Sequence, residues 1–286
     1  MPAETYILVF SCADQPGIVA RTTQAIFAGG GNILESSQYN DAQTERFFMR
    51  TAFRLAEGSD LAALTSGLGE LAALYGWTWT LRPAGQRQRV LILVSKFDHC
   101  LVDLLYRQRI GELEMDVVGI VSNHPLTGFE GLDLRDIPFH HLPMTAATKA
   151  VQEARLWDLH RELGADLVVL ARYMQVLSDE LAAKFAGRCV NIHHSFLPGF
   201  KGAKPYHQAH VRGVKVIGAT AHYVTGDLDE GPIIEQDVER ISHADTADDL
   251  VRKGRDIERR VLSRAVGLHI SGRVLPNGAR TVVFRD

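Results

Sequence analysis

The 286-residue chain has little of several features that would define a protein class. Its three cysteines, Cys12, Cys100 and Cys189, lie far apart, which argues against a disulfide framework and against a CxxC metal knuckle. No apolar run approaches the roughly 20 residues that cross a bilayer, and the first residues lack the pattern of a signal peptide. The 34 Asp and Glu residues outnumber the 31 Lys and Arg residues, so binding dominated by nucleic-acid phosphates is not expected. We therefore expect a soluble cytoplasmic protein that binds neither membranes nor nucleic acids.

Residues 1–83 show the pattern of a small α+β domain. Short runs of strand composition alternate with two segments whose apolar residues recur at helical spacing. The expected elements are strand 6–11, helix 16–27, strands 32–39 and 46–54, helix 61–75 and strand 77–81. This βαββαβ order predicts a ferredoxin-like fold with two packed layers.

A different pattern follows a polar segment. Residues 84–89 are rich in Gly, Gln and Arg and contain little that could pack, so they predict a linker. In residues 90–286, continuous apolar runs alternate with helical patterns, which predicts an open, mostly parallel, doubly wound α/β sheet. The expected strands are 90–94, 115–121, 165–171, 189–193, 216–224 and 232–241, and the expected helices are 101–109, 148–163, 179–185 and 245–269. A final hairpin is expected around the Pro276–Gly278 turn.

Two short segments carry side chains suited to catalysis. Asn191 and His193 alternate along the expected strand, so both point to one face at the end where open α/β sheets bind ligands. An amide can donate to a developing oxyanion, and an imidazole exchanges protons near neutral pH. The turn 225–232 displays Asp229 among three carboxylates, and a carboxylate beside His193 could act as a base or orient the imidazole. Because N-x-H pairs and acidic turns are also common structural features, the spacing alone leaves both interpretations open.

Twelve histidines also raise the question of a metal site. His207 and His210, or the adjacent His193 and His194, could supply imidazoles to a hydrolytic metal centre. However, the segment around His207 and His210 has the pattern of an exposed helix, and adjacent residues of a strand point to opposite faces. We therefore predict that the site binds no metal.

Four segments resemble known families. Residues 191–198 (NIHHSFLP) and 228–234 (LDEGPII) resemble the signature pair of the 10-formyltetrahydrofolate-dependent formyltransferase fold, and residues 14–19 (DQPGIV) and 31–33 (GNI) resemble an ACT domain, a small module that senses ligands. Joined in this order, they resemble the formyltetrahydrofolate deformylase family over essentially the whole chain. Further matches are 202–208, 218–220 and 254–256.

The resemblance implies a hydrolase that converts 10-formyltetrahydrofolate into formate and tetrahydrofolate. Such an enzyme supplies formate to purine synthesis and needs no cofactor, since the folate is its substrate. The resemblance also implies that Asn191 and the His193 imidazolium stabilise the oxyanion, and that Asp229 organises or deprotonates the attacking group. It assigns substrate binding to a pterin loop and to the opposite wall of a pocket. These residues are Arg172, Tyr173, Met174, Gln175, Val176 and Leu177, together with Thr225, Gly226 and Asp227.

One departure helps to choose within the wider family. Glycinamide ribonucleotide transformylase has a turn rich in glycine and asparagine after its first strand, and the backbone N–H groups of that turn bind a phosphate. The corresponding turn here, Ser95–Cys100, is bulky, lacks glycine and includes Asp98, which would repel a phosphate. We therefore expect water to be the acceptor. Formyl transfer to glycinamide ribonucleotide and a non-catalytic sensor of folate or amino acids remain the alternatives.

The N-terminal domain is expected to regulate the enzyme. ACT domains commonly pair with one another and bind amino acids at the interface, which makes Asp14, Gly17, Asn32 and Ile33 candidate ligand-binding residues. The resemblance implies a homo-oligomer, a dimer or a tetramer, with methionine and glycine as opposing effectors. The alternative is that this domain only assembles the oligomer.

Overall fold

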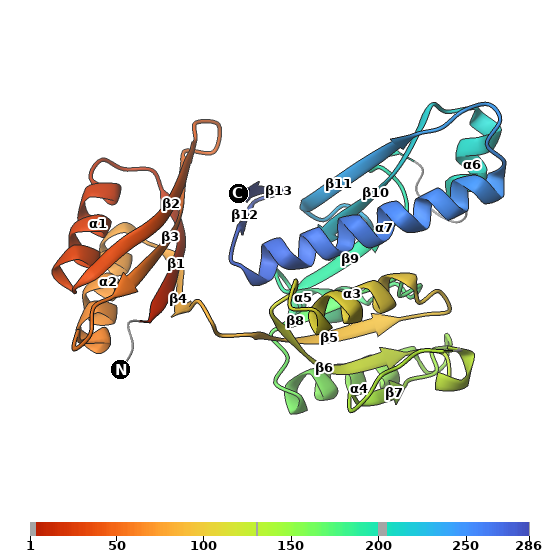
Figure 1. Ribbon diagram of the computed structural model, residues 1–286, viewed down its shortest axis with the longest axis horizontal. Coiled ribbons are helices and arrows are strands. Elements are labelled where there is room, and N and C mark those ends of the chain that lie inside the picture. The colour runs from red at the N-terminus through yellow and green to blue at the C-terminus, as the bar shows by residue number, and fades with distance from the viewer. Residues whose placement is uncertain (1–3, 130, 200–204, 286) are drawn as a thin grey trace. The chain divides into compact units, whose positions relative to one another are not determined.

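The computed structural model describes residues 4–129, 131–199 and 205–285, and these form two compact units (Figure 1). The first unit comprises the chain up to Gln86 with Ser271–Asn277 and the residues from Val282 onward, and the second comprises Arg87–Ile270 with Gly278–Thr281. The sequence pattern predicts a second domain that contains all of residues 90–286. The C-terminal segments depart from that division because they pack with apolar residues of the first unit.

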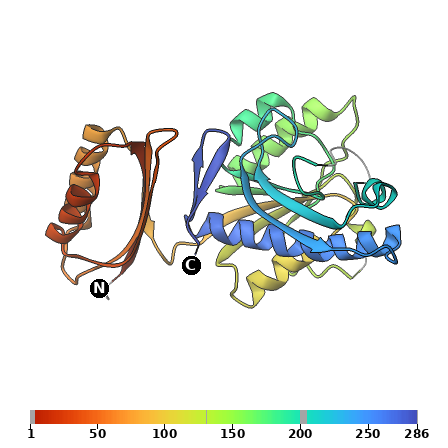
Figure 2. The same ribbon diagram turned by 90° about the horizontal axis from the view of Figure 1, so that it is seen from above.

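The first unit has the predicted βαββαβ order. Its elements are β1 (Thr5–Ala13), α1 (Ile18–Ala28), β2 (Gly31–Asp41), β3 (Arg46–Leu55), α2 (Leu61–Tyr75) and β4 (Thr78–Pro83). The strands form an antiparallel sheet in the order β2-β3-β1-β4, and both helices cover one face of it (Figure 2). The bounds of α2 follow from its sequence: the Asp60 carboxylate accepts hydrogen bonds from the backbone at the N-terminus, and Gly76 ends the helix in the left-handed conformation.

Both faces of this sheet carry apolar residues. On the helical side, Phe10 stacks on Trp77 with ring centroids 3.9 Å apart, inside the main core of the unit. A second cluster joins Phe48 of β3 to Leu275 and Phe284. This cluster explains why residues from the end of the chain belong to the first unit, since burial of apolar surface holds them there.

The second unit contains a seven-stranded sheet. Its elements are β5 (Gln88–Val94), α3 (His99–Arg109), β6 (Met115–Ser122), η1 (Leu126–Gly128), β7 (Phe139–His141), α4 (Lys149–Glu162), β8 (Leu167–Leu170), α5 (Asp179–Lys184), β9 (Cys189–His193), α6 (Pro205–Arg212), β10 (Val216–Tyr223), β11 (Ile233–Arg240) and α7 (Ala247–Ile270). The predicted linker 84–89 ends two residues early, because Gln88 and Arg89 already pair with β6. The short elements η1 and β7 were not predicted, since three residues show no periodicity. The hairpin of β12 (Val274–Asn277) and β13 (Arg280–Val283) follows α7, as predicted.

The strand order of this sheet defines where a ligand can bind. The order is β11-β10-β9-β8-β5-β6-β7, with parallel pairing from β9 to β7 and antiparallel pairing at β10 and β11, so the prediction of a mostly parallel sheet is confirmed. Helices α3 and α7 cover one face and α4 and α5 the other (Figure 2). The chain moves outward from β5 through β6 to β7 and then returns to the other side of β5 with β8. Ligands of open α/β sheets bind at the carboxyl ends of strands beside such a reversal.

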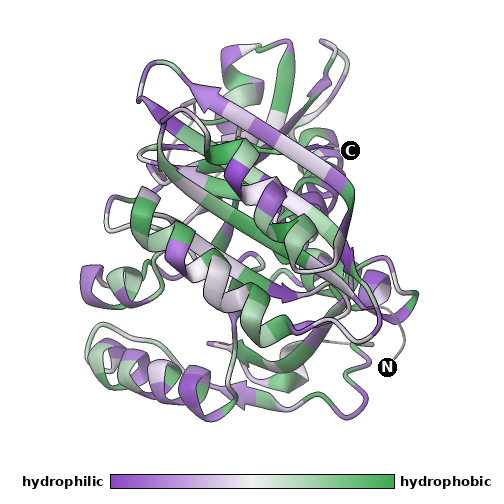
Figure 3. Ribbon diagram, turned by 90° about the vertical axis from the view of Figure 1, so that its left-hand side faces the viewer, coloured by the Kyte–Doolittle hydropathy of each residue, from purple (hydrophilic) through white to green (hydrophobic). Residues whose placement is uncertain are grey.

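The composition of the elements agrees with their packing. In Figure 3 the helices carry hydrophobic and hydrophilic residues side by side, as expected when one face packs on a sheet and the other meets water. Within the described part of the chain, no helix is long and apolar enough to cross a bilayer. The three cysteines are buried free thiols.

Candidate active site

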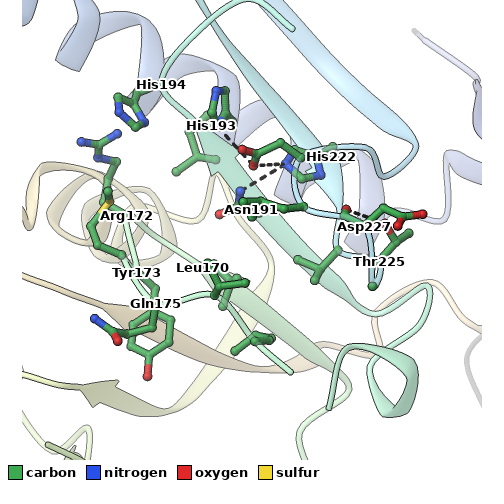
Figure 4. Close-up of a pocket in the computed structure, with 18 residues that line it drawn as sticks. Leu170, Arg172, Tyr173, Gln175, Asn191, His193, His194, His222, Thr225 and Asp227 are labelled. Carbon is green, nitrogen blue, oxygen red and sulfur yellow. Dashed lines mark hydrogen bonds and ion pairs between the residues drawn. The ribbon is translucent and has the colours of Figure 1, made fainter. Parts of the chain in front are cut away.

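A cavity lies beside the carboxyl ends of β8 and β9 (Figure 4). It brings together every residue to which the resemblance gives a catalytic or substrate-binding role. These residues are Arg172, Tyr173, Met174, Gln175, Val176, Leu177, Asn191, His193, Thr225, Gly226, Asp227 and Asp229. Leu170, Ile192, His194, His222, Val224 and Leu228 complete its lining. Three separate segments of the chain, 170–177, 191–194 and 222–229, therefore form one site.

The amide, imidazole and carboxylate named from the sequence meet inside this cavity. Asn191 and His193 alternate along β9, and Asp229 lies on the turn between β10 and β11 with its backbone in the left-handed region (φ 58°). Asp229 Oδ1 is 3.2 Å from His193 Nδ1. Because the carboxylate can only accept, His193 Nδ1–H donates to it, and Nε2 is left as the other functional atom of the ring. Nε2 is buried and has no hydrogen-bond partner among the described residues.

His222 is a fourth member of this group, although no pattern in the sequence predicted it. Its Nδ1–H donates to the Tyr223 carbonyl oxygen at 2.9 Å, which leaves Nε2 as the ring nitrogen that faces the site. That Nε2 lies 3.1 Å from Asn191 Nδ2 and 3.7 Å from Asp229 Oδ1. The antiparallel register that pairs His222 with Asn191 places it there. The sequence did predict the strand, but the register that pairs two residues 31 positions apart depends on the tertiary fold.

The surroundings keep the Asp229 carboxyl ionised. Burial by itself would raise its pKa, but hydrogen bonding and electrostatic attraction to His193 and His222 outweigh burial and hold the pKa well below its usual range. Asp229 is therefore a carboxylate at neutral pH. It is a weak base, and its charge orients the His193 ring beside it.

His194 also lines the cavity, contrary to prediction. Strand alternation predicts that the adjacent His193 and His194 point to opposite faces, yet both line the cavity and their ring centroids lie 5.3 Å apart. The reason is that β9 ends at His193, so strand alternation does not extend to the next residue. Burial, helped by the nearby charge of Arg172, lowers the pKa of His194 to about 3, which keeps this ring neutral.

The lowered pKa of His194 predicts a stability that depends on pH. Between about pH 3 and the ordinary histidine pKa of about 6.5, His194 binds a proton in the unfolded chain but not in the folded chain. The free energy of unfolding therefore falls as the pH falls. At pH 4.5 this costs about 3 kcal/mol relative to pH 7. In urea unfolding at the two pH values, His194→Gln should lose markedly less stability than the unaltered protein. His207→Gln, on the exposed side of α6, is the control and should leave the difference unchanged; equal losses in all three proteins would contradict the prediction.

The other sequence candidates for a metal or a ligand lie elsewhere. His207 and His210 are exposed on α6, as expected. Among the described residues one group of three potential ligands lies within reach of a single ion, namely His99, Cys100 and Glu258, and none of these three lines the cavity. Burial raises the pKa of the Cys100 thiol well above its usual value, which disfavours the thiolate that a metal would need. The prediction of a metal-free site stays a prediction.

The predicted effector residues lie on two elements of the first unit. Asp14 and Gly17 belong to the β1–α1 turn, where the Asp14 carboxylate accepts a hydrogen bond from Asn40, and Gly17 begins α1 with a positive φ. Asn32 and Ile33 lie on β2, and Ile33 packs against the core. In the motif 202–208, residues 202–204 lie outside the described residues, and the rest begins α6.

Comparison with known proteins agrees with the geometry. The sequence pattern of the formyl transferase family matches residues 88–266, which include the whole cavity. A formyltetrahydrofolate deformylase from Corynebacterium sp. (strain P-1) is 50% identical and covers 98% of each chain. The crystal structure of formyltetrahydrofolate deformylase from Burkholderia mallei has a TM-score of 0.94 at 50% identity, covering 99% of this chain and 100% of that one. A glycinamide ribonucleotide transformylase from Symbiobacterium toebii has a TM-score of 0.66 at 32% identity and covers only 72% of this chain.

The fold and the site therefore define an enzyme of the formyl transferase class. Within that class the chain belongs to the formyltetrahydrofolate deformylase family, whose members match it along both units.

Proposed function

We propose that this protein hydrolyses 10-formyltetrahydrofolate to formate and tetrahydrofolate. The observation that carries the proposal is the meeting of Asn191, His193 and Asp229 in a cavity at the carboxyl ends of β8 and β9. The full-length similarity to formyltetrahydrofolate deformylases supports the choice of hydrolysis over transfer to an amine.

The three polar residues divide the chemistry between them. Asp229 orients a water against the formyl carbon, while the Asn191 amide and a protonated His193 stabilise the oxygen that becomes negative as the water attacks. The proton released by the water passes to the Asp229–His193 pair and then to N10 as the N10–carbon bond breaks. Because Asp229 stays ionised, it can hold the His193 ring in position through this step.

The pterin loop supplies the apolar walls of the substrate site. Met174 and Val176 are about half exposed although both are apolar, and Leu177 is buried behind them. A flat pterin ring between this loop and Thr225–Asp227 would cover these side chains and would meet backbone groups along its edge. Tyr173, Gln175 and the remaining lining residues of the loop then set the shape of the pocket.

A formate-release assay tests this function. Pure protein incubated with 10-formyltetrahydrofolate and no amine should release one formate for each tetrahydrofolate formed. If product appeared only when glycinamide ribonucleotide is added, the assigned function would be formyl transfer and not hydrolysis. Folate binding without any turnover would instead support the sensor.

We also propose that the first unit is an ACT domain that assembles a homo-oligomer and binds methionine and glycine at Asp14, Gly17, Asn32 and Ile33. The βαββαβ fold and the exposed edge strand β2 support this proposal. Calorimetric titration with each amino acid should show saturable binding that Asn32→Ala weakens at least tenfold. If the unaltered protein bound neither amino acid, the first unit would keep only the role of assembling the oligomer.

A further inference from the structure

Arg172 has a backbone conformation that arginine rarely adopts. Its φ is 64°, in the left-handed region that side chains with a Cβ disfavour. Four non-glycine residues within the described ranges share a positive φ, and two of them, Arg172 and Asp229, line the cavity. Strain of this kind persists only where the surroundings hold a residue in place, and it concentrates at functional sites.

A buried carboxylate holds the Arg172 side chain. Arg172 Nε lies 3.3 Å from Glu258 Oε2 on α7, and both side chains are at least nine-tenths buried. The same carboxylate accepts a hydrogen bond from Tyr206 Oη at 2.7 Å and lies 2.9 Å from His99 Nε2. Burying two charges costs more than their attraction usually returns, so stability alone does not explain this arrangement.

Two sequence motifs that the reaction does not use build this network. His99 belongs to the bulky turn Ser95–Cys100 after β5, which lacks the glycines of a phosphate-binding turn. Gly254, from the match 254–256, leaves room for the Tyr206 ring, because a Cβ there would lie 2.1 Å from Tyr206 Cζ. Residues of α6, of α7 and of the turn Ser95–Cys100 therefore hold the side chain of Arg172 in place.

The fixed arginine occupies one end of the active-site cavity. In Figure 4, Arg172 and His194 lie on one side of the group formed by Asn191, His193 and His222, and Thr225 and Asp227 lie on the other. Arginine is always protonated, and His194 is a buried neutral ring with a low pKa, so neither side chain can serve as a base at neutral pH. With the pterin ring against Thr225–Asp227, as proposed above, an amine acceptor would enter at the Arg172 end. There, as an ammonium ion, it would meet another cation, and neither Arg172 nor His194 could take its proton.

We propose that Arg172, fixed by Glu258, determines the specificity of the enzyme by filling the acceptor end of the cavity, so that the formyl group passes to water and not to an amine. This inference rests on the hydrolysis proposed above. In the excluded reaction the amine nitrogen would bond to the formyl carbon, the N10–carbon bond would break, and an amine proton would move to N10. The side chain of Arg172 occupies the space that the amine would need, and its positive charge repels the ammonium form of the amine.

The test is a competition between water and glycinamide, a small primary amine. With 10-formyltetrahydrofolate and excess glycinamide, the unaltered protein should form formate and almost no N-formylglycinamide, as measured by mass spectrometry. Arg172→Gly removes the side chain at a position whose φ suits glycine, and should raise the ratio of N-formylglycinamide to formate at least tenfold. In this variant Glu258 loses its cation. If the single variant does not fold, the double variant Arg172→Gly with Glu258→Gln takes its place.

Tyr206→Phe is the matched control. It removes one hydrogen bond to Glu258 but keeps the ring volume and Arg172, so the product ratio should stay as in the unaltered protein. An unchanged ratio in a folded Arg172→Gly variant that still releases formate would overturn the inference while leaving hydrolysis intact. A folded variant that forms neither product would also overturn it, because Arg172 would then be needed for the reaction itself. No formate from the unaltered protein would count against the proposed function instead.

Discussion

Asp229→Asn should lower kcat for formate release by about 10²–10⁴-fold and leave KM within about threefold. The substitution keeps the shape of the side chain, and asparagine tolerates the left-handed backbone at this position. What it removes is the negative charge that binds His193 and orients the water, and both effects act mainly in the transition state. Steady-state formate release, measured across substrate concentrations, separates kcat from KM.

Glu230→Gln is the control for this prediction. It makes the same chemical change at the next residue of the same turn, where the side chain is exposed and outside the cavity. Its kcat should stay within about twofold of the unaltered protein. A loss below tenfold for Asp229→Asn, or an effect on KM alone, would show that Asp229 binds substrate without taking part in the chemical step.

Asn191→Ala should lower kcat by about 10²–10³-fold, the usual effect of removing one donor to an oxyanion. Asn191 Nδ2 already lies 3.1 Å from His222 Nε2, which fixes the amide and leaves its second hydrogen free to meet the substrate oxygen. Preorganisation of this kind makes the donor effective, because no reorganisation is required when charge develops.

Asn191→Asp distinguishes a donor from a structural residue. Aspartate has nearly the same volume as asparagine but offers an acceptor where the amide had a donor, so kcat should fall at least as far as in Asn191→Ala. Retention of activity in Asn191→Asp, or a fall of less than tenfold in Asn191→Ala, would indicate that Asn191 only packs against β10. Thermal unfolding of both variants checks that lost activity is not lost fold.

Much of this site could be predicted because its residues follow local rules. The alternation of side chains along a strand places Asn191 and His193 on one face, and a strand is recognisable from five residues. The apolar periodicity of α2, with Asp60 and Gly76 at its ends, likewise needs no information beyond the segment itself. The resemblance to a family then connected Asp229 with the strand, which spacing alone could not do.

The features that were not predicted depend on long-range packing. His222 joins the site through the register between β9 and β10. Arg172 was named from the sequence, but its partner Glu258, which lies 86 residues further along the chain, was not. The C-terminal segment belongs to the first unit because Leu275 and Phe284 pack with Phe48 there. No local pattern reports such contacts.

The sequence by itself determined the order of most helices and strands and the ferredoxin-like domain ahead of the mostly parallel sheet, because periodicity and caps act over a few residues. The family resemblance of its short motifs then named Asn191, His193 and Asp229 as the candidate catalytic residues. Only the tertiary structure decided which histidine lies beside the Asn191 amide, which carboxylate pairs with Arg172 and to which unit the end of the chain belongs. Those outcomes depend on strand register and on the pairing of buried charges between distant segments, which become defined only when the whole unit packs.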